Sequence, residues 1–423
     1  MTLPEFFTRV EAHPLYWVAL GFFALYPVVS AIVWISTALQ FYLRRERREE
    51  GAPEGRTPPQ LARYPMVSVL IPAYCEAKVI AETLACATNL DYPSYEVVVV
   101  DDASTDGTKE AVRPFVESGR VRLIAKLQNE GKAMAMNDAL PCLAGEIVLI
   151  MDADASPDPQ ILRWIVPHFE SPRVAGVTGN PRVANRATFL SQLQLVEFTS
   201  IVSLLRRAQR IWGRILTMSG VVGAFRRAAL LDVGLYSPEM ATEDIDMTWN
   251  LQREHYDVRY EPRALVWMRV PPTLGQLITQ RRRWAMGLAQ VLRRYAGIAL
   301  SWRARRMWPV FWESLLSILW AYCFVLLTTF WILSYAIGVP PVGASPIPNW
   351  WGMTIGTLCL AQLLTGVLLD SNYDRTVVKH FPVAVSYPII YWMLMSLITF
   401  VATPVGLFKR ARKGTVTQWK TVR

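Results

Sequence analysis

Charged residues are missing from four long stretches of this 423-residue chain, at 15–43, 314–337, 350–369 and 381–408. A helix that crosses a bilayer needs about 20 mostly apolar residues, so each stretch is long enough to span a membrane. The first stretch has no basic segment before it and no small-residue cleavage site, and it is too long for a signal peptide. We therefore expect it to remain in the protein as a membrane anchor.

Cysteine is scarce, and the common nucleotide-binding motifs are absent. The five cysteines are scattered without a CxxC pair, which argues against a disulfide framework or a zinc site and fits a reduced cytosolic environment. No GxGxxG follows an apolar run, and "NEGKA" (129–133) lacks the spacing of a P-loop. A dinucleotide-dependent oxidoreductase and a P-loop NTPase are both disfavoured.

The net charge is +10, and positive residues cluster beside the apolar stretches. "RRERR" (44–48) follows the first stretch and "KRARK" (409–413) follows the last, as expected for cytoplasmic flanks. Nucleic-acid binding is the alternative explanation, but clusters that adjoin spans are better explained by the membrane surface. We expect a lipid bilayer as partner and no nucleic acid.

The predicted number of membrane spans conflicts with a cytoplasmic position of the basic C-terminal tail. Three simple spans after the central region would place the basic tail outside the cell. Pro388 and Pro404 lie in the last apolar stretch, so we predict that 381–408 is bent, re-entrant or partly interfacial and that the tail is cytoplasmic.

The central region has the pattern of an α/β domain. After a Pro/Gly-rich linker at 51–65, short apolar runs rich in β-branched residues alternate with helix-like segments. The predicted strands are 66–74, 95–104, 121–127 and 146–154, and the predicted helices are 78–89 and 132–143. This alternation predicts a mostly parallel sheet covered on both faces, with its functional site at the carboxyl ends of the strands.

Carboxylates follow these strands. Asp152 and Asp154 are spaced i and i+2, which places both on one face of an extended chain, and such oxygen ligands suit Mg²⁺ or Mn²⁺ shared with phosphates. A loop-capping pair is the alternative. Asp101 and Asp102 end another strand, where an acid commonly binds a ribose or base, although an Asx-turn in "DDASTDGT" is also consistent.

A third acidic group is "ATEDIDM" (241–247), which contains Glu243, Asp244 and Asp246. Its simplest explanation is a helix N-terminus with Thr242 as the cap, a structure that would also hold a catalytic carboxylate in place.

The order of these motifs resembles the processive family 2 glycosyltransferases, inverting membrane enzymes that include cellulose, chitin and hyaluronan synthases. Strand–Tyr–x–Glu, strand–Asp–Asp, Gly–Lys, strand–DxD, Thr–Glu–Asp and Gln–x–x–Arg–Trp follow one another over roughly 65–300. The resemblance implies a GT-A-like nucleotide-sugar domain that acts on a UDP-sugar with Mg²⁺ or Mn²⁺.

The resemblance also implies roles for individual residues. Asp244 would be the general base, with Glu243 beside it in the catalytic group. Asp152 and Asp154 would hold the metal. The expected UDP-sugar site consists of Pro72, Tyr74, Glu76, Asp102, Lys132, Asp152 and Arg283. The expected acceptor site consists of Trp284, Gln280, Ser219 and Gly220.

The Gln–x–x–Arg–Trp stretch belongs to a predicted amphipathic helix. Gln280, Arg283 and Trp284 are spaced i, i+3 and i+4 and share one face, whereas Arg281 and Arg282 are expected to point toward lipid headgroups. A second interfacial helix is predicted at 188–212, with leucines opposite Arg206, Arg207 and Arg210.

Several longer segments are most similar to bacterial poly-β-1,6-N-acetylglucosamine synthases. These are "VTGNPRVANR", "SGVVGAFRRAAL", "TEDIDMTWNLQ" and "YEPRALVW". The resemblance implies UDP-GlcNAc as donor, a growing polysaccharide as acceptor, and a small membrane partner subunit under cyclic di-GMP control. The sequence contains no recognisable cyclic-di-GMP domain, and one early span is found where this branch can carry two.

Other functions remain open at this point. A chitin-, hyaluronan- or cellulose-type synthase would keep every motif, a non-processive lipid-sugar transferase would not need Gln–x–x–Arg–Trp, and a channel would place charges in its spans. We expect a multi-pass protein of the bacterial inner membrane with a cytoplasmic catalytic domain. The expected division is an anchor (1–50), a linker (51–65), a GT-A domain (66–270), interfacial helices (271–308), a membrane region (309–408) and a basic tail (409–423).

Overall fold

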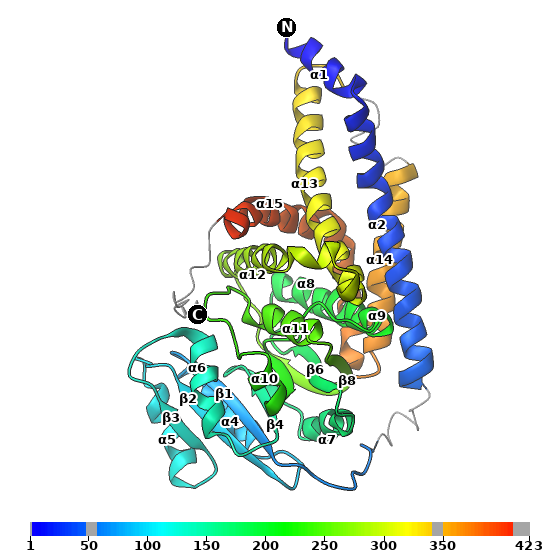
Figure 1. Cartoon of the computed structure of the whole chain (residues 1–423). Coiled ribbons are helices and arrows are strands. Elements are labelled where there is room, and N and C mark those ends of the chain that lie inside the picture. Colours follow the sequence, from blue (N-terminus) through cyan, green and yellow to red (C-terminus); the bar gives the residue numbers. More distant parts are fainter. Residues whose placement is uncertain (1, 48–56, 341–349, 409–423) are drawn as a thin grey trace.

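The computed structural model describes residues 2–47, 57–340 and 350–408. The predicted basic cluster at 409–413, the last residue of the cluster at 44–48 and residues 51–56 of the predicted linker lie outside the described residues. Apolar helices extend from one end of an α/β domain, with a layer of helices between the two parts (Figure 1).

The α/β domain is built on one sheet of eight strands in the order β3-β2-β1-β4-β7-β6-β8-β5. The strands are β1 Val67–Ala73, β2 Tyr95–Asp101, β3 Arg122–Ala125, β4 Ile147–Met151, β5 Ser156–Pro157, β6 Val174–Val183, β7 Val222–Arg226 and β8 Asp257–Met268. The four predicted strands are β1 to β4, and they pair in parallel. β6 and β8 also pair in parallel, whereas β7 runs antiparallel to β4 and β6, and β5 runs antiparallel to β8. The sheet is therefore mostly parallel, as expected.

Helices cover both faces of the parallel half. Val69 and Ile71 of β1 pack with α4 (Ile80–Ala87) and α5 (Thr108–Glu117), whereas Leu70 packs with α6 (Gly131–Ala139). All seven residues of β1 are buried, because the two faces of this strand both meet helices.

A second group of helices lies between the sheet and the apolar helices (Figure 1). It comprises α8 Phe189–Glu197, η4 Phe198–Val202, α9 Ser203–Trp212, α11 Glu243–Arg253 and α12 Leu274–Arg294, and the shorter α7 Ile161–Ile165 and α10 Arg227–Asp232 cover the sheet elsewhere.

The prediction of an interfacial helix at 188–212 is wrong for its polar face, because Arg206 and Arg207 are both buried inside the protein. Arg207 Nε lies 2.6 Å from Glu46 Oε1, and its Nη1 lies 2.8 Å from Asp370 Oδ1. Those carboxylates end two apolar helices that are distant in sequence, and their charges hold the arginine inside the protein.

The structure contains four helical segments that are long and apolar enough to cross a membrane, at Pro14–Glu46, Trp302–Ala336, Gly352–Asp370 and Arg375–Phe408. Their α-helices are α2 Pro14–Phe41, α13 Trp308–Ala336, α14 Trp350–Asp370 and α15 Trp392–Phe408. Figure 1 shows α2, α13 and α14 extending in a common direction, whereas α15 runs across them and lies along α12.

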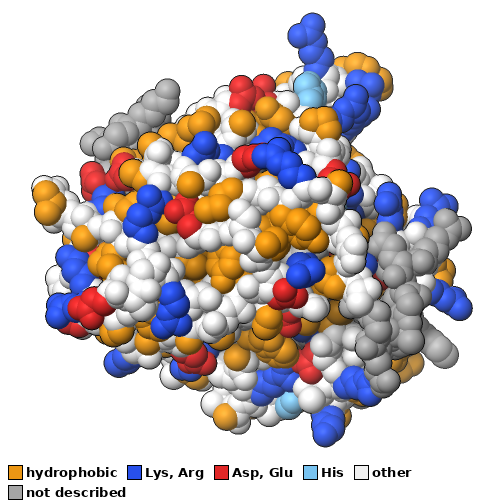
Figure 2. Space-filling model, turned by 90° about the horizontal axis from the view of Figure 1, so that it is seen from below, with side chains coloured by type: hydrophobic (Ala, Val, Ile, Leu, Met, Phe, Trp, Pro, Cys, Tyr) orange, Lys and Arg blue, Asp and Glu red, His pale blue; other side chains and the backbone are white. Residues whose placement is uncertain are grey.

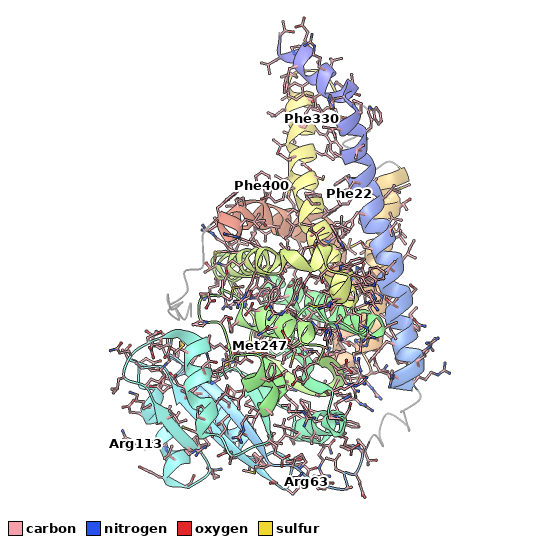
Figure 3. All side chains as sticks on the ribbon, viewed as in Figure 1. Phe22, Arg63, Arg113, Met247, Phe330 and Phe400 are labelled. Carbon is pink, nitrogen blue, oxygen red and sulfur yellow. The ribbon has the colours of Figure 1, made fainter. Side chains whose placement is uncertain are left out.

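Aromatic side chains join the N-terminal helices to α13. Phe7 of α1 (Leu3–Ala12) stacks on Phe330 with ring centroids 4.9 Å apart, and Trp320 Nε1 donates to the carbonyl of Phe23. Figure 3 shows Phe22 and Phe330 on these neighbouring helices and Phe400 on α15. The opposite end of the molecule differs in character: Figure 2 shows lysines, arginines and acidic residues interspersed over the underside of the α/β domain, as on a surface in water.

Candidate active site

Lys132 is the centre of a cluster drawn from four separate segments. Its Nζ lies 2.5 Å from Asp152 Oδ1, 3.2 Å from the Gly220 carbonyl oxygen and 3.8 Å from Glu243 Oε1. Burial opposes the charge on Lys132, but Asp152 and Glu243 outweigh that effect, and the pKa of the ammonium group is raised. The lysine therefore stays charged and links the end of β4 to the start of α11.

Asp244 lies beside this cluster. A Cβ placed on Gly220 would be 3.3 Å from Asp244 Oδ2 and 3.7 Å from Lys132 Nζ, so a side chain at position 220 would crowd both groups. Burial and the neighbouring Glu243 raise the pKa of Asp244 to about 6, although Lys132 and Arg283 oppose the shift. A carboxylate with this pKa can accept a proton near neutral pH.

Thr242 is the N-cap residue of α11, as predicted, but its side chain does not cap the helix. No side-chain cap hydrogen bond is present at Thr242, and its Oγ1 is buried without a hydrogen-bond partner among the described residues. Packing explains this, because Thr242 lies directly against Gly287 of α12. The Ala241 amide also donates to Gln290 Oε1 at 3.1 Å. The acidic segment is therefore positioned by α12.

Asp102 braces the loop that leads to Lys132. Its two carboxylate oxygens accept hydrogen bonds from the backbone amides of Glu130 (3.1 Å) and Gly131 (2.7 Å), and the residue is fully buried. Direct contact of Asp102 with a nucleotide stays a prediction. In this structure the carboxylate holds the start of α6 and so sets the position of Lys132.

The loops after β1 and β2 are held together by side-chain hydrogen bonds. The amide of Cys75 donates to Ser104 Oγ and that of Glu76 to Thr108 Oγ1, both at 2.9 Å. Thr108 in turn donates its amide to Asp106 Oδ1, which is the turn expected from "DDASTDGT". Pro72 and Glu76 are buried and Tyr74 is half-buried at this carboxyl edge of the sheet.

Cys75 and Ala103 follow these two strands with positive φ values of 55° and 62°. Non-glycine residues adopt this conformation at a cost of about 1–3 kcal/mol, and such strain is concentrated at functional sites.

The prediction that Arg281 points toward lipid is wrong. Arg281 is 5% exposed, its Nη2 lies 2.5 Å from Glu197 Oε2, and its guanidinium lies 4.1 Å from the centre of the Trp284 ring. Tyr391 also donates to Glu197, at 2.7 Å. Arg281 therefore fixes Trp284, and α12 is enclosed by neighbouring helices on this side. Arg282 is exposed, as expected.

The other predicted acceptor residues are placed as follows. Gln280 is half-buried, and its Oε1 has no hydrogen-bond partner among the described residues. Arg283 is exposed and close enough to lower the pKa of Asp244. The Ser219 amide donates to Thr178 Oγ1 at 2.9 Å, which places Ser219 and Gly220 between β6 and the start of β7.

A family model described as glycosyltransferase-like family 2 matches residues 65–287. This range contains the site from β1 to Gly287 of α12. The chain belongs to the family 2 glycosyltransferases. It is accordingly an enzyme that transfers sugars, and the GT-A fold expected from the sequence is confirmed.

This family 2 glycosyltransferase is similar to named relatives over nearly its whole length. It is 30% identical to a poly-β-1,6-N-acetyl-D-glucosamine synthase of Staphylococcus epidermidis over 410 residues, covering 95% of this chain and 97% of the relative. It is 29% identical to synthases of the same name from Staphylococcus aureus, with the same coverage. The expected resemblance to this branch is confirmed.

A solved structure shares the fold. The mannosyltransferase PcManGT of Pyrobaculum calidifontis, in complex with GDP-mannose and Mn²⁺, superposes with a TM-score of 0.62 at 24% identity. The match covers 92% of this chain and 99% of the mannosyltransferase, so the likeness includes the apolar helices.

The carboxylates of Asp152 and Asp154 suit a divalent cation that arrives bound to the phosphates of a substrate. Within the described ranges, no group of three or more His, Cys, Asp and Glu side chains could hold a metal ion. Asp152 and Asp154 nevertheless supply two carboxylates directly after β4, and Mg²⁺ commonly takes one or two carboxylates and completes its shell with water and phosphate oxygens. The residues fit a substrate-borne cation better than a permanently caged one.

Sequence reasoning missed Gly287, Gln290 and the pairing of Arg281 with Glu197. Gly287 alone carried a signal, because glycine inside a helix costs about 1 kcal/mol relative to alanine and its presence suggests a close packing contact. The partners of Gln290 and Arg281 are distant in sequence and left no local pattern.

Proposed function

We propose that this chain polymerises N-acetylglucosamine from UDP-GlcNAc into a β-1,6-linked exopolysaccharide. The observation that carries the proposal is the similarity to poly-β-1,6-N-acetyl-D-glucosamine synthases across 95% of the chain, including both membrane ends. The position of the Lys132 cluster beside Asp244 supports a direct glycosyl transfer.

In this mechanism Asp244 accepts the proton of the acceptor sugar hydroxyl. The hydroxyl oxygen forms a bond to the anomeric carbon of the donor while the bond from that carbon to the diphosphate oxygen breaks, and UDP leaves with the electron pair. Attack opposite the leaving group converts an α-linked donor into a β-linked product. General-base catalysis of this kind contributes about 10²–10⁴-fold.

Positive groups around the site suit a diphosphate leaving group. Lys132 is held charged among carboxylates, and Arg283 extends from α12 on the same side as Asp244. We assign both to the diphosphate, where negative charge grows in the transition state. Asp152 and Asp154 would hold Mg²⁺ or Mn²⁺, which would neutralise part of that charge.

The acceptor would lie against α12. Trp284 offers an aromatic surface for the apolar face of a sugar, and Arg281 keeps its ring in place. The unpartnered Oε1 of Gln280 can accept a hydrogen bond from a sugar hydroxyl. Gly220, which follows Ser219, has no side chain and so leaves room beside Asp244 for the attacking hydroxyl.

We further propose that the chain is a multi-pass protein of the bacterial inner membrane that starts the export of its product. α2, α13 and α14 would cross the bilayer, with the α/β domain in the cytoplasm. A cavity of about 220 Å³ lies between α12, α13 and α15, and Trp320, Trp392, Ser317 and Ser396 are among its lining residues. Aromatic rings and hydroxyls of this kind suit a sugar chain.

Regulation would come from another protein. By resemblance, a small membrane partner subunit responsive to cyclic di-GMP is expected to pack beside the spans. The exposed apolar residues of α2, such as Val18, Val29 and Ile32, provide a surface for lipid or for such a partner.

The test is a synthesis assay on membranes that carry this protein, with and without the candidate partner, supplied with UDP-GlcNAc and Mg²⁺. UDP release and polymer that a β-1,6-N-acetylglucosaminidase-type hydrolase digests would support donor and linkage together. Asp244→Asn should abolish both signals. Asp246→Asn is the matched control, because Asp246 faces Tyr295 (3.1 Å) on the other side of the same helix.

The remaining outcomes separate the parts of the proposal. UDP release with a product that resists the hydrolase would keep the mechanism and reject the linkage. Polymer from UDP-glucose or a mixture of donors, with no turnover of UDP-GlcNAc, would indicate a cellulose- or hyaluronan-type synthase instead.

A further inference from the structure

A basic cavity of about 140 Å³ lies outside the active site. It is formed where the end of α9, the end of α11 and η6 (Trp302–Met307) meet, and η6 leads directly into the apolar helix α13. The catalytic acids lie at the opposite end of α11, a helix of 11 residues, so the two sites are about 15 Å apart.

The cavity has an excess of positive charge. Its lining includes Arg214, Arg253, Arg303, Arg306 and His255. Arg214 has a distant carboxylate partner, Asp257 at 3.6 Å, and Arg253 pairs with the exposed Glu254 at 3.1 Å. Arg303 and Arg306 form no ion pair with any described carboxylate. The four guanidinium groups therefore have two carboxylate partners among the described residues, and neither of these carboxylates lines the cavity.

Arg214 is the buried floor of this cavity. The residue is 4% exposed, and its Nε has no hydrogen-bond partner within the described part of the chain. Burial lowers the pKa of its guanidinium, and the nearby charge of Arg306 adds to that effect, whereas Asp257 opposes it. An anion in the cavity would supply the missing acceptor and relieve the repulsion between the arginines.

Exposed apolar side chains adjoin the cavity-lining residues Ser301 and Arg303 in the sequence. Leu300 is 93% exposed and Trp302 is 68% exposed, and both immediately precede the basic residues of η6. Exposed tryptophan next to arginine at the start of a spanning helix is typical of the membrane–water interface. Such a segment places the cavity at the depth of lipid headgroups.

We propose that this cavity binds the phosphate group of an anionic phospholipid. Arginine is well matched to phosphate because its planar group presents several donors at once. The cavity is smaller than the 300–1,000 Å³ or so that sites for drug-sized ligands occupy, which suits a headgroup whose acyl chains stay in the bilayer. The bound lipid would fix η6, and with it the junction between the catalytic domain and α13.

The experiment measures lipid binding by the full-length chain, delipidated in an uncharged detergent, with no sugar donor present. Short-chain dihexanoyl phosphatidylglycerol is titrated by calorimetry, and inorganic phosphate is titrated separately. Arg303→Gln and Arg306→Gln are compared with Arg305→Gln. Arg305 is an exposed neighbour in η6 that lies over Trp302 and does not line the cavity. Circular dichroism confirms that each variant is folded.

We expect saturable binding of phosphatidylglycerol that weakens about fivefold in each of Arg303→Gln and Arg306→Gln, as expected for loss of one basic contact to an anionic lipid. Arg305→Gln should bind like the unmodified chain. Binding of inorganic phosphate without binding of the lipid would overturn the lipid assignment. Equal weakening by all three variants, or no saturable binding, would overturn the site. Because the readout is binding, the result does not depend on the sugar that the enzyme polymerises.

Discussion

Gly287→Ala should uncouple the Gln–x–x–Arg–Trp helix from the catalytic acids. A Cβ at position 287 would be 2.8 Å from Thr242 Cβ and still closer to its Oγ1 and Cγ2. No real Cβ tolerates such contacts, so α12 or the segment before Glu243 must move. Overpacking of this kind costs about 1–3 kcal/mol of stability.

The expected effect on catalysis is larger than the effect on stability. Arg283 and Trp284 lie one turn before Gly287 on α12, and Asp244 lies two residues after Thr242. A displacement of about 1 Å between them would lower kcat/KM by about 10²-fold. The measurement is UDP release by membranes containing equal amounts of folded protein.

Two further variants make this reasoning refutable. Gly275→Ala is the matched control, since a Cβ at this position of the same helix meets nothing within 4 Å, and full activity is expected. Adding Thr242→Ala to Gly287→Ala removes the two closest atoms and should restore part of the activity. Full activity of Gly287→Ala alone, or no rescue by the second substitution, would show that this contact does not position the acids.

Three other predictions concern the base, the buried arginine and the cation. Burial and Glu243 raise the pKa of Asp244 to about 6, so its carboxylate becomes protonated as the pH falls through that value. We therefore expect kcat/KM to drop about tenfold per pH unit below pH 6. A pH profile that stays flat down to pH 5 would reject Asp244 as the base. Arg281→Gln removes the charge partner of Glu197, whose side chain is only 12% exposed, and should destabilise the protein by about 3 kcal/mol. The exposed Arg282→Gln should change thermal stability little, and equal melting temperatures for both variants would contradict this assignment. Removal of divalent cations with EDTA should abolish UDP release, and added Mg²⁺ or Mn²⁺ should restore it. Asp154→Asn should raise the cation concentration that is needed for UDP release. Undiminished activity in EDTA would argue against a cation at Asp152 and Asp154.

The strands and the long apolar helices were predictable because the sequence patterns that indicate them are local. Four β-branched runs became β1 to β4 with ends shifted by a few residues, and four uncharged stretches became candidate spans. The family resemblance also placed Asp152 and Lys132 in one expected site, and Lys132 Nζ lies 2.5 Å from Asp152 Oδ1. The strands from β5 to β8 were not predicted, since the alternation of strand and helix does not continue there.

The errors share one physical cause. Arg206, Arg207 and Arg281 have the helical spacing of the polar face of an interfacial helix, yet each is buried. Amphipathic spacing shows only that a helix has a polar face. Whether that face meets water, lipid or a carboxylate depends on what packs against it, and Glu46, Glu197 and Asp370 are more than 80 residues away from their partners.

The sequence by itself determined the type of molecule: an α/β domain with acidic strand ends, joined to long apolar helices, in the motif order of one enzyme family. Periodicity, charge and motif spacing act within a few residues of one another, so they can be interpreted without a structure. The tertiary structure decided which charges pair, that Asp102 braces a loop, that the Thr242 side chain packs on Gly287 without making a capping hydrogen bond, and that α15 crosses the other apolar helices. Those outcomes depend on burial and on partners brought together from distant parts of the chain, and these are properties of the packed molecule.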